Sequence, residues 1–104
     1  MAWILVVVAG LLEAIWATTM KYSNGFTLFW PSVATVLTML VSFFMLSVAM
    51  KTLPLGPSYM VWVGIGALGA FIAGIVLHGE ALSLTRVAAA GLIVAGMALM
   101  KLSA

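Results

Sequence analysis

The first apolar run of the chain reads WILVVVAGLLEAIWATTM over residues 3–20. Its one charged side chain is Glu13, close to the middle of the run. A bilayer core of about 30 Å is crossed by a helix of roughly 20 apolar residues, so the run is long enough to span a membrane. It therefore predicts a transmembrane helix that carries a carboxylate at mid-membrane depth.

The composition of the chain indicates a membrane protein. Of its 104 residues, 66% are hydrophobic and 6% are charged, whereas a soluble domain is about 45–50% apolar and about 25% charged. The sequence therefore predicts an all-α integral membrane protein. It contains no cysteine, which rules out disulfides and thiolate metal sites. The net charge of +2 is scattered along the chain, so no nucleic acid partner is expected.

Four apolar runs predict four membrane spans in a single domain that covers residues 1–104. The segments between the runs carry turn signals at Asn24-Gly25, Pro54 and Gly79. Loops this short place each helix antiparallel to the one before it. The predicted spans lie at about residues 3–20, 29–50, 58–77 and 82–100.

Positive charges in the loops normally fix the orientation of a membrane protein, because they favour the cytoplasmic side. Here Lys51 and Lys101 fall on one predicted side, and Lys21 and Arg86 fall on the other. With two positive charges on each side, the loops favour neither orientation of the chain in the membrane. Either other features fix one orientation, or the chain inserts both ways. Insertion both ways would allow an antiparallel, dual-topology dimer.

Glu13 lies about 15 Å along the helix from Trp3, which is half of a bilayer core. A charge at that depth costs at least about 2.5–3.5 kcal/mol, and such residues usually mark ion or proton pathways. In an antiparallel dimer, two Glu13 carboxylates would meet at the same depth and titrate as a coupled pair. The structural alternative is a permanently protonated Glu13 that is hydrogen-bonded in a helix interface.

Two neighbours on the first span favour a functional Glu13. Gly10 and Trp16 share one broad helix face with it, because they lie three residues away on either side. Gly10 leaves space beside the carboxylate, and the indole N–H of Trp16 can donate to it.

Further candidates lie on the second and third spans. Ser42 belongs to a stripe of small and hydroxyl residues near mid-membrane, a pattern that also suits plain helix packing. Tyr59 and Trp62 lie three residues apart, and aromatic faces beside a carboxylate can hold a cation. An interfacial aromatic belt is the alternative, and it suits Tyr59 better than Trp62.

Glycines shape the third predicted span. Gly64 and Gly66 loosen the helix where a bend or a close helix contact could form. His78 has no second ligand at a useful spacing, so no metal site is expected. The sequence holds no nucleophile–base pair and no phosphate-binding loop. We therefore expect no catalytic residue, no enzymatic activity and no cofactor.

Several motifs together resemble the small multidrug resistance transporters over essentially the whole chain. They are AGLLEAIWA (9–17), KYSNGF (21–26), WPS (30–32), LPLG (53–56) and YMVWVGIGALGA (59–70). The resemblance implies an antiparallel, dual-topology homodimer in a bacterial inner membrane, surrounded by lipid. It also implies that two central glutamates bind either protons or a cationic substrate.

Within that family the chain looks like a guanidinium exporter. Trp16, the GIGA motif at 64–67 and Lys101 are typical of that subtype, whereas Pro57, Met60 and Val63 depart from its usual pattern. The resemblance carries six residues over to the binding site: Gly10, Glu13, Trp16, Ser42, Tyr59 and Trp62.

The predicted function is a proton-coupled antiporter in which Ser42 and Trp16 orient the Glu13 pair for guanidinium. Two alternatives stay open. One is a polyspecific exporter of quaternary ammonium compounds from the same family, and the other is one half of a heterodimeric pair.

Overall fold

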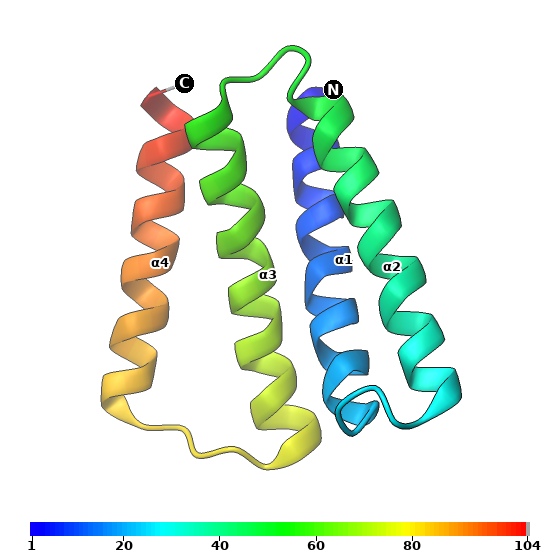
Figure 1. The fold of residues 1–104 in the computed structure, drawn as a ribbon. Helices are drawn as coiled ribbons and strands as arrows, with labels where there is room; N and C mark the ends of the chain where they lie inside the picture. The colour runs from blue at the N-terminus through cyan, green and yellow to red at the C-terminus, as the bar shows by residue number, and fades with distance from the viewer. Residues whose placement is uncertain (104) are drawn as a thin grey trace.

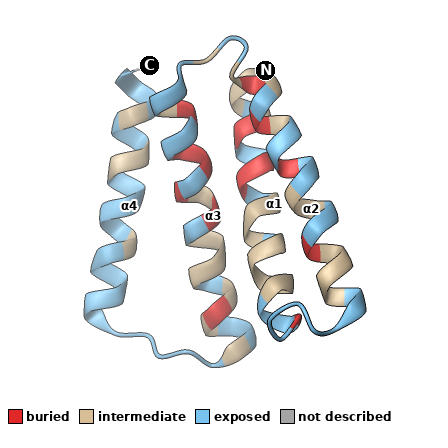
Figure 2. Ribbon diagram, in the orientation of Figure 1, coloured by how far each residue is buried: buried red, intermediate tan, exposed pale blue. Residues whose placement is uncertain are grey.

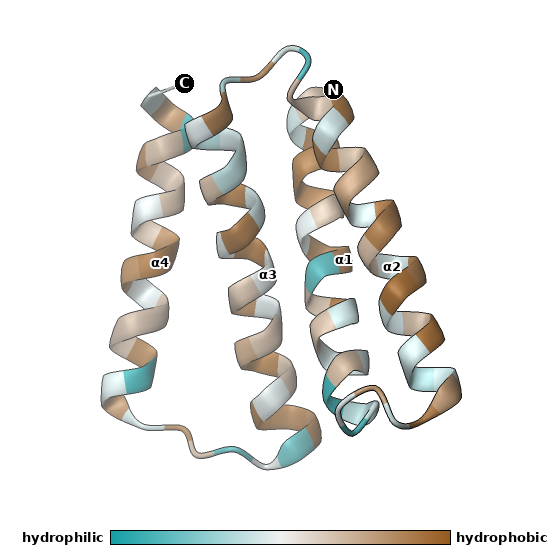
Figure 3. Cartoon of the chain, in the orientation of Figure 1, coloured by the Kyte–Doolittle hydropathy of each residue, from teal (hydrophilic) through white to brown (hydrophobic). Residues whose placement is uncertain are grey.

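The computed structural model describes residues 1–103, and over that range the chain forms four α-helices (Figure 1). All four are long and apolar enough to cross a membrane. The most hydrophilic residues lie toward the helix ends and loops, apart from one hydrophilic position in the middle of α1 (Figure 3). The predicted all-α architecture with four spans is confirmed. The helices are α1 (Ala2–Tyr22), α2 (Phe29–Ala49), α3 (Leu55–His78) and α4 (Leu84–Ser103).

The helices alternate in direction, so both termini and the α2–α3 loop lie at one end of the bundle (Figure 1). Helix α1 packs against both α2 and α3, whereas α4 approaches only α3 closely among the described helices. At its C-terminal end α4 has one further link to α1, because the Lys101 Nζ lies 5.4 Å from the centre of the Trp3 ring. The chain is a flat slab with extents of 40 × 34 × 17 Å.

The buried core lies where α1, α2 and α3 meet (Figure 2). Within the described residues, α4 contributes no buried residue. A single chain therefore covers only one side of its central helix, α3, with a packed core. The buried hydrophobic residues are Val6, Ala9, Leu46, Ala49, Val61 and Trp62.

The helix ends differ from the predicted spans by up to three residues, and the largest differences lie in α3 and α4. Helix α3 begins at Leu55 instead of residue 58, because Pro57 is tolerated in the first helical turn, where its missing N–H has no partner to lose. Helix α4 begins at Leu84 instead of residue 82 and continues to Ser103. Its start is fixed by Ser83, whose hydroxyl accepts the backbone N–H of Arg86 at 3.2 Å, a typical N-cap contact.

The predicted turns form where the glycines require them. Asn24 and Gly25 both have positive φ angles, of 51° and 72°, and they reverse the chain between α1 and α2. Gly79 has a φ of 64° in the left-handed region and ends α3, as a helix-terminating glycine does. These turns set the direction in which each helix returns through the bundle.

Candidate functional site

Glu13 lies near the middle of α1, about 17 Å from the start of the helix by the rise per residue. Its half-buried side chain lies between α1 and α3. A Cβ atom built on Gly66 would overlap the Glu13 carboxylate. The absence of a side chain at Gly66 therefore creates the space that this carboxylate occupies.

Small residues bring α1 and α3 together on both sides of Glu13. A Cβ on Gly10 would stand 2.7 Å from the Cβ of Ile65, a distance that side chains do not adopt. A Cβ on Gly69 would overlap Ala14. The close approach of the two helices therefore holds the Glu13 side chain of α1 against a defined part of α3.

Ser42 joins three helices through its hydroxyl group. It donates a hydrogen bond to the Ala9 carbonyl of α1 at 2.7 Å and accepts one from the Trp62 Nε1 of α3 at 3.0 Å. A serine hydroxyl carries one proton, so Ser42 cannot also donate to Glu13 while it donates to Ala9. Within the chain Ser42 therefore orients Trp62, and an orienting contact from Ser42 to Glu13 stays a prediction.

Trp16 also differs from its expected role. Its Nε1 atom is buried and makes no hydrogen bond to any of residues 1–103, so the expected bond to Glu13 is not formed within the chain. Its ring instead meets Phe43 edge to face, with centroids 6.4 Å apart.

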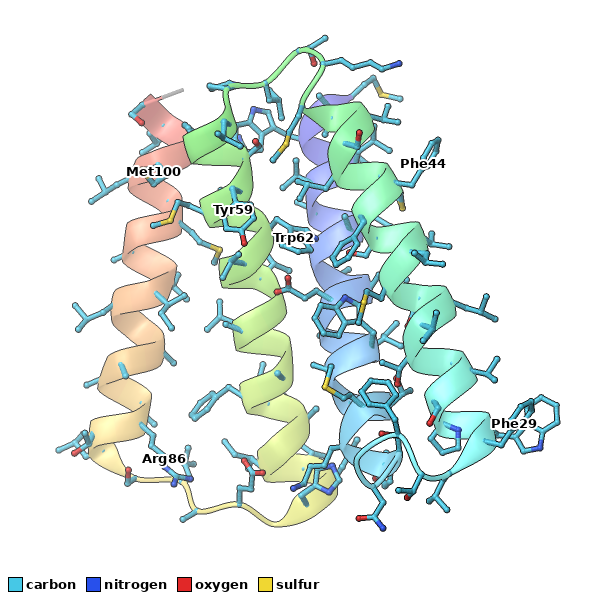
Figure 4. All side chains as sticks on the ribbon, in the orientation of Figure 1. Phe29, Phe44, Tyr59, Trp62, Arg86 and Met100 are labelled. Atoms are coloured by element: carbon cyan, nitrogen blue, oxygen red, sulfur yellow. The ribbon has the colours of Figure 1, made fainter. Side chains whose placement is uncertain are left out.

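Aromatic side chains line one cavity beside the α2–α3 interface. The centre of the Trp62 ring lies 5.4 Å from that of Tyr59 and 5.9 Å from that of Phe43. Figure 4 shows Tyr59 and Trp62 on the part of α3 near the α2–α3 loop. The cavity has a volume of about 400 Å³ and is also lined by Met50. Tyr59 and Trp62 were predicted for the site.

Phe43 was missed by sequence reasoning, although its ring contacts both Trp16 and Trp62. A phenylalanine within a continuous apolar run gives no signal of its own. Its position directly after Ser42 was the only available hint.

Comparisons with known proteins bear on this geometry. The profile described as "Small Multidrug Resistance protein" matches residues 1–93. The chain belongs to the small multidrug resistance family. It is 54% identical over 103 residues to a protein of Yersinia pseudotuberculosis named "Guanidinium exporter", with 99% of each chain covered. A protein of Citrobacter freundii with the same name is 54% identical, covering 99% of this chain and 98% of that one.

Membership of the small multidrug resistance family makes the chain a transporter and not an enzyme. Together with the four membrane-spanning helices, it makes the chain a multi-pass protein of the bacterial inner membrane. Both expectations from the sequence are confirmed.

Two glycines of this small multidrug resistance transporter were expected to form a hinge or a packing contact. Gly66 receives Glu13, and Gly64 faces α4, where a Cβ would overlap the Met97 side chain. Helix α3 is α-helical throughout Leu55–His78. Both glycines thus serve close contacts here, and a hinge role stays a prediction. Over residues 1–103, no three His, Asp or Glu side chains come together as a metal site would need.

Proposed function

We propose that this transporter is a proton-coupled antiporter that exports guanidinium or small guanidinyl cations. The observation that carries the proposal is the high identity, over nearly the full length, to relatives named guanidinium exporters. The position of Glu13 adds a physical reason, because a carboxylate at mid-helix between α1 and α3 offers a cation its charge partner.

Guanidinium suits this environment chemically. It is a flat cation with N–H donors around its edge, and that geometry matches bidentate binding by a carboxylate. Its faces stack favourably on aromatic rings. In the proposed complex, Glu13 supplies the charge, while the rings of Trp16, Tyr59 and Trp62 supply the surrounding surface. Ser42 holds Trp62 in place through the hydrogen bond to its Nε1.

A second copy of the chain is part of the proposal. One chain offers a single mid-membrane carboxylate, and α4 contributes no buried residue within the described range. The loop charges are balanced between the two ends of the bundle, which suits insertion in both directions. In an antiparallel homodimer, two Glu13 side chains share one substrate between them.

Coupling to protons follows from competition for these carboxylates. A protonated Glu13 has no charge to offer, so the cation leaves when protons bind. Exclusive occupancy by protons or substrate, combined with alternating access to a site at the middle of the membrane, gives exchange driven by the proton gradient.

One observation favours a second candidate, a polyspecific exporter of quaternary ammonium ions. The cavity of about 400 Å³ is lined by three aromatic rings and Met50. Quaternary ammonium ions donate no hydrogen bonds and are held by aromatic surfaces, while methionine adapts to bulky shapes.

Uptake of labelled guanidinium into proteoliposomes separates the two candidates. The purified chain should accumulate guanidinium when the lumen is acidic, and it should prefer guanidinium to tetraethylammonium. Glu13→Gln should lose proton-driven uptake, because the amide keeps the shape but cannot exchange a proton. Cross-linking of the same samples checks that the variant still assembles.

Proton-driven uptake by Glu13→Gln would contradict the role of the carboxylate. A preference of the parent chain for tetraethylammonium would replace the guanidinium proposal with its alternative. Activity of the purified chain alone would also show that a second, different chain is not required.

A further inference from the structure

The sequence contains two acidic residues, and both of their side chains lie against glycines of α3. Glu13 occupies the space over Gly66, and the Glu80 carboxylate stands where a Cβ of residue 74 would be. Gly66 and Gly74 lie on one broad side of α3, about 12 Å apart along its axis. The two carboxylates therefore contact α3 at two depths: Glu13 at mid-membrane and Glu80 at the end of the bundle.

The end of α3 places Glu80 at Gly74. Gly79 adopts a left-handed φ of 64°, and its N–H donates to the Gly74 carbonyl. The N–H of Glu80 donates to the same carbonyl at 3.2 Å. This kind of cap folds the chain back over the last helical turn. Gly74 therefore receives both the backbone of the cap and the carboxylate that follows it.

A cavity of about 200 Å³ lies between α1 and α3 beside Glu80. Half of its lining residues are alanine or glycine, and its polar groups come from Thr18, Lys21, His78 and Glu80. Ala17, which follows Glu13 by one helical turn, forms part of the same wall. The cavity thus begins one turn beyond the mid-membrane carboxylate and ends at the membrane surface.

The cavity holds several hydrogen-bond acceptors. The Thr18 hydroxyl donates its proton to the Ala14 carbonyl at 2.8 Å, which leaves its oxygen free to accept. The His78 Nε2 is buried and makes no hydrogen bond within the described part of the chain, and it accepts one when the ring carries its proton on Nδ1. Glu80 adds an exposed carboxylate. Together they suit a small cation that carries several N–H donors.

Two cationic side chains border the same carboxylate. Lys21 lines the cavity, and Arg86 lies on the α4 side of Glu80, where its guanidinium donates to the Ala81 carbonyl at 2.8 Å. Glu80 offsets part of this positive charge and supplies the negative group that a cation would bind at this end of the α1–α3 interface.

We propose that Glu80, with Thr18 and His78, forms a second binding site for guanidinium, between the water and the Glu13 site. This inference rests on the proposed function, because it deepens the route of the same substrate. Guanidinium binds first at Glu80 and then passes to Glu13, a step that requires the close contact between Gly69 and Ala14, which lies between the two sites, to open.

The test compares the parent chain with Glu80→Gln, Glu80→Asp and Gly74→Ala in the proteoliposome assay. Glu80→Gln should raise the KM for guanidinium about fivefold, which corresponds to about 1 kcal/mol, and leave kcat unchanged. Glu80→Asp keeps the charge and should restore most of the affinity. Gly74→Ala keeps Glu80 but displaces its carboxylate, so it should raise the KM in the same way. A purely structural role of Glu80 would lower kcat or the melting temperature instead.

The two proposals fail in different ways. A parent chain that transports no guanidinium would overturn both. If the parent transports guanidinium and Glu13→Gln does not, while Glu80→Gln keeps the KM of the parent, the second site alone is overturned. A KM that rises equally in Glu80→Gln and Glu80→Asp would also overturn it, because the charge would then be irrelevant.

Discussion

Helices α1 and α4 both pack against α3, but they do so in very different ways. Helix α1 buries Val6, Ala9 and Gly10 and places a carboxylate against Gly66. Helix α4 buries no residue within the described range and packs mainly against α3. A charged group in a membrane needs a packed, specific environment, whereas an apolar helix can face lipid or a second copy of the chain without cost.

Glycines make the contrast between these two contacts sharp. Gly10 and Gly66 lie at close contacts where an added Cβ would overlap other atoms. Gly91 on α4 has no atom within 4 Å of an added Cβ. Glycine therefore allows close helix packing between α1 and α3, whereas Gly91 on α4 has no packing partner within the chain.

The largest effect is expected for Gly66→Ala. The added methyl group would occupy the place of the Glu13 carboxylate, and overpacking of this kind costs about 1–3 kcal/mol. Guanidinium transport should fall by about 100-fold, the factor that corresponds to nearly 3 kcal/mol. Initial uptake rates in proteoliposomes measure this, and uptake at the parental rate would mean that Glu13 does not depend on this contact.

A smaller effect is expected for Ser42→Ala, which breaks the link between the three core helices. The Trp62 Nε1 would lose its acceptor, and a buried donor without a partner costs about 1–3 kcal/mol. The melting temperature in detergent should fall, and guanidinium transport should fall by about tenfold.

Thr38→Ala is the matched control for Ser42→Ala on the same helix. The Thr38 hydroxyl bonds only to carbonyls of its own helix, at 2.6 Å to Ala34 and 3.2 Å to Thr35. Equal losses in the two variants would show that the bonds of Ser42 to α1 and α3 have no special importance.

The smallest effect is expected for Gly91→Ala. Within one chain the new methyl group meets nothing, and alanine is favoured over glycine in a helix by about 1 kcal/mol. The melting temperature should therefore stay the same or rise slightly, and transport should be unchanged. Loss of the cross-linked dimer in this variant would instead place Gly91 in the contact with a second copy.

The sequence predicted the helices well, because membrane spans and glycine turns depend on local composition. Asn24-Gly25 and Gly79 lie at the expected turns. The start of α3 was placed three residues too late, since the segment Leu55–Pro57 has the composition of a loop and only its position after Pro54 makes it the first turn of a helix.

The side-chain partners could not be predicted in the same way. Helix α3 is apolar on all sides, so its sequence does not indicate which face meets α1. The pairing of Glu13 with Gly66, and of Ser42 with Ala9 and Trp62, depends on how the helices are rotated about their axes. Glu13 itself was predictable because a charge in an apolar run is rare.

The single proton of Ser42 makes two hydrogen bonds mutually exclusive. While that proton is shared with the Ala9 carbonyl, a contact from Ser42 to a carboxylate has to be made by breaking the bond between α1 and α2. The stretching frequency of the Ala9 carbonyl, isolated by carbon-13 labelling, would then rise whenever Ser42 turned to another acceptor. An infrared spectrum of one peptide group in α1 would thus report which partner Ser42 holds, in every state of the transport cycle.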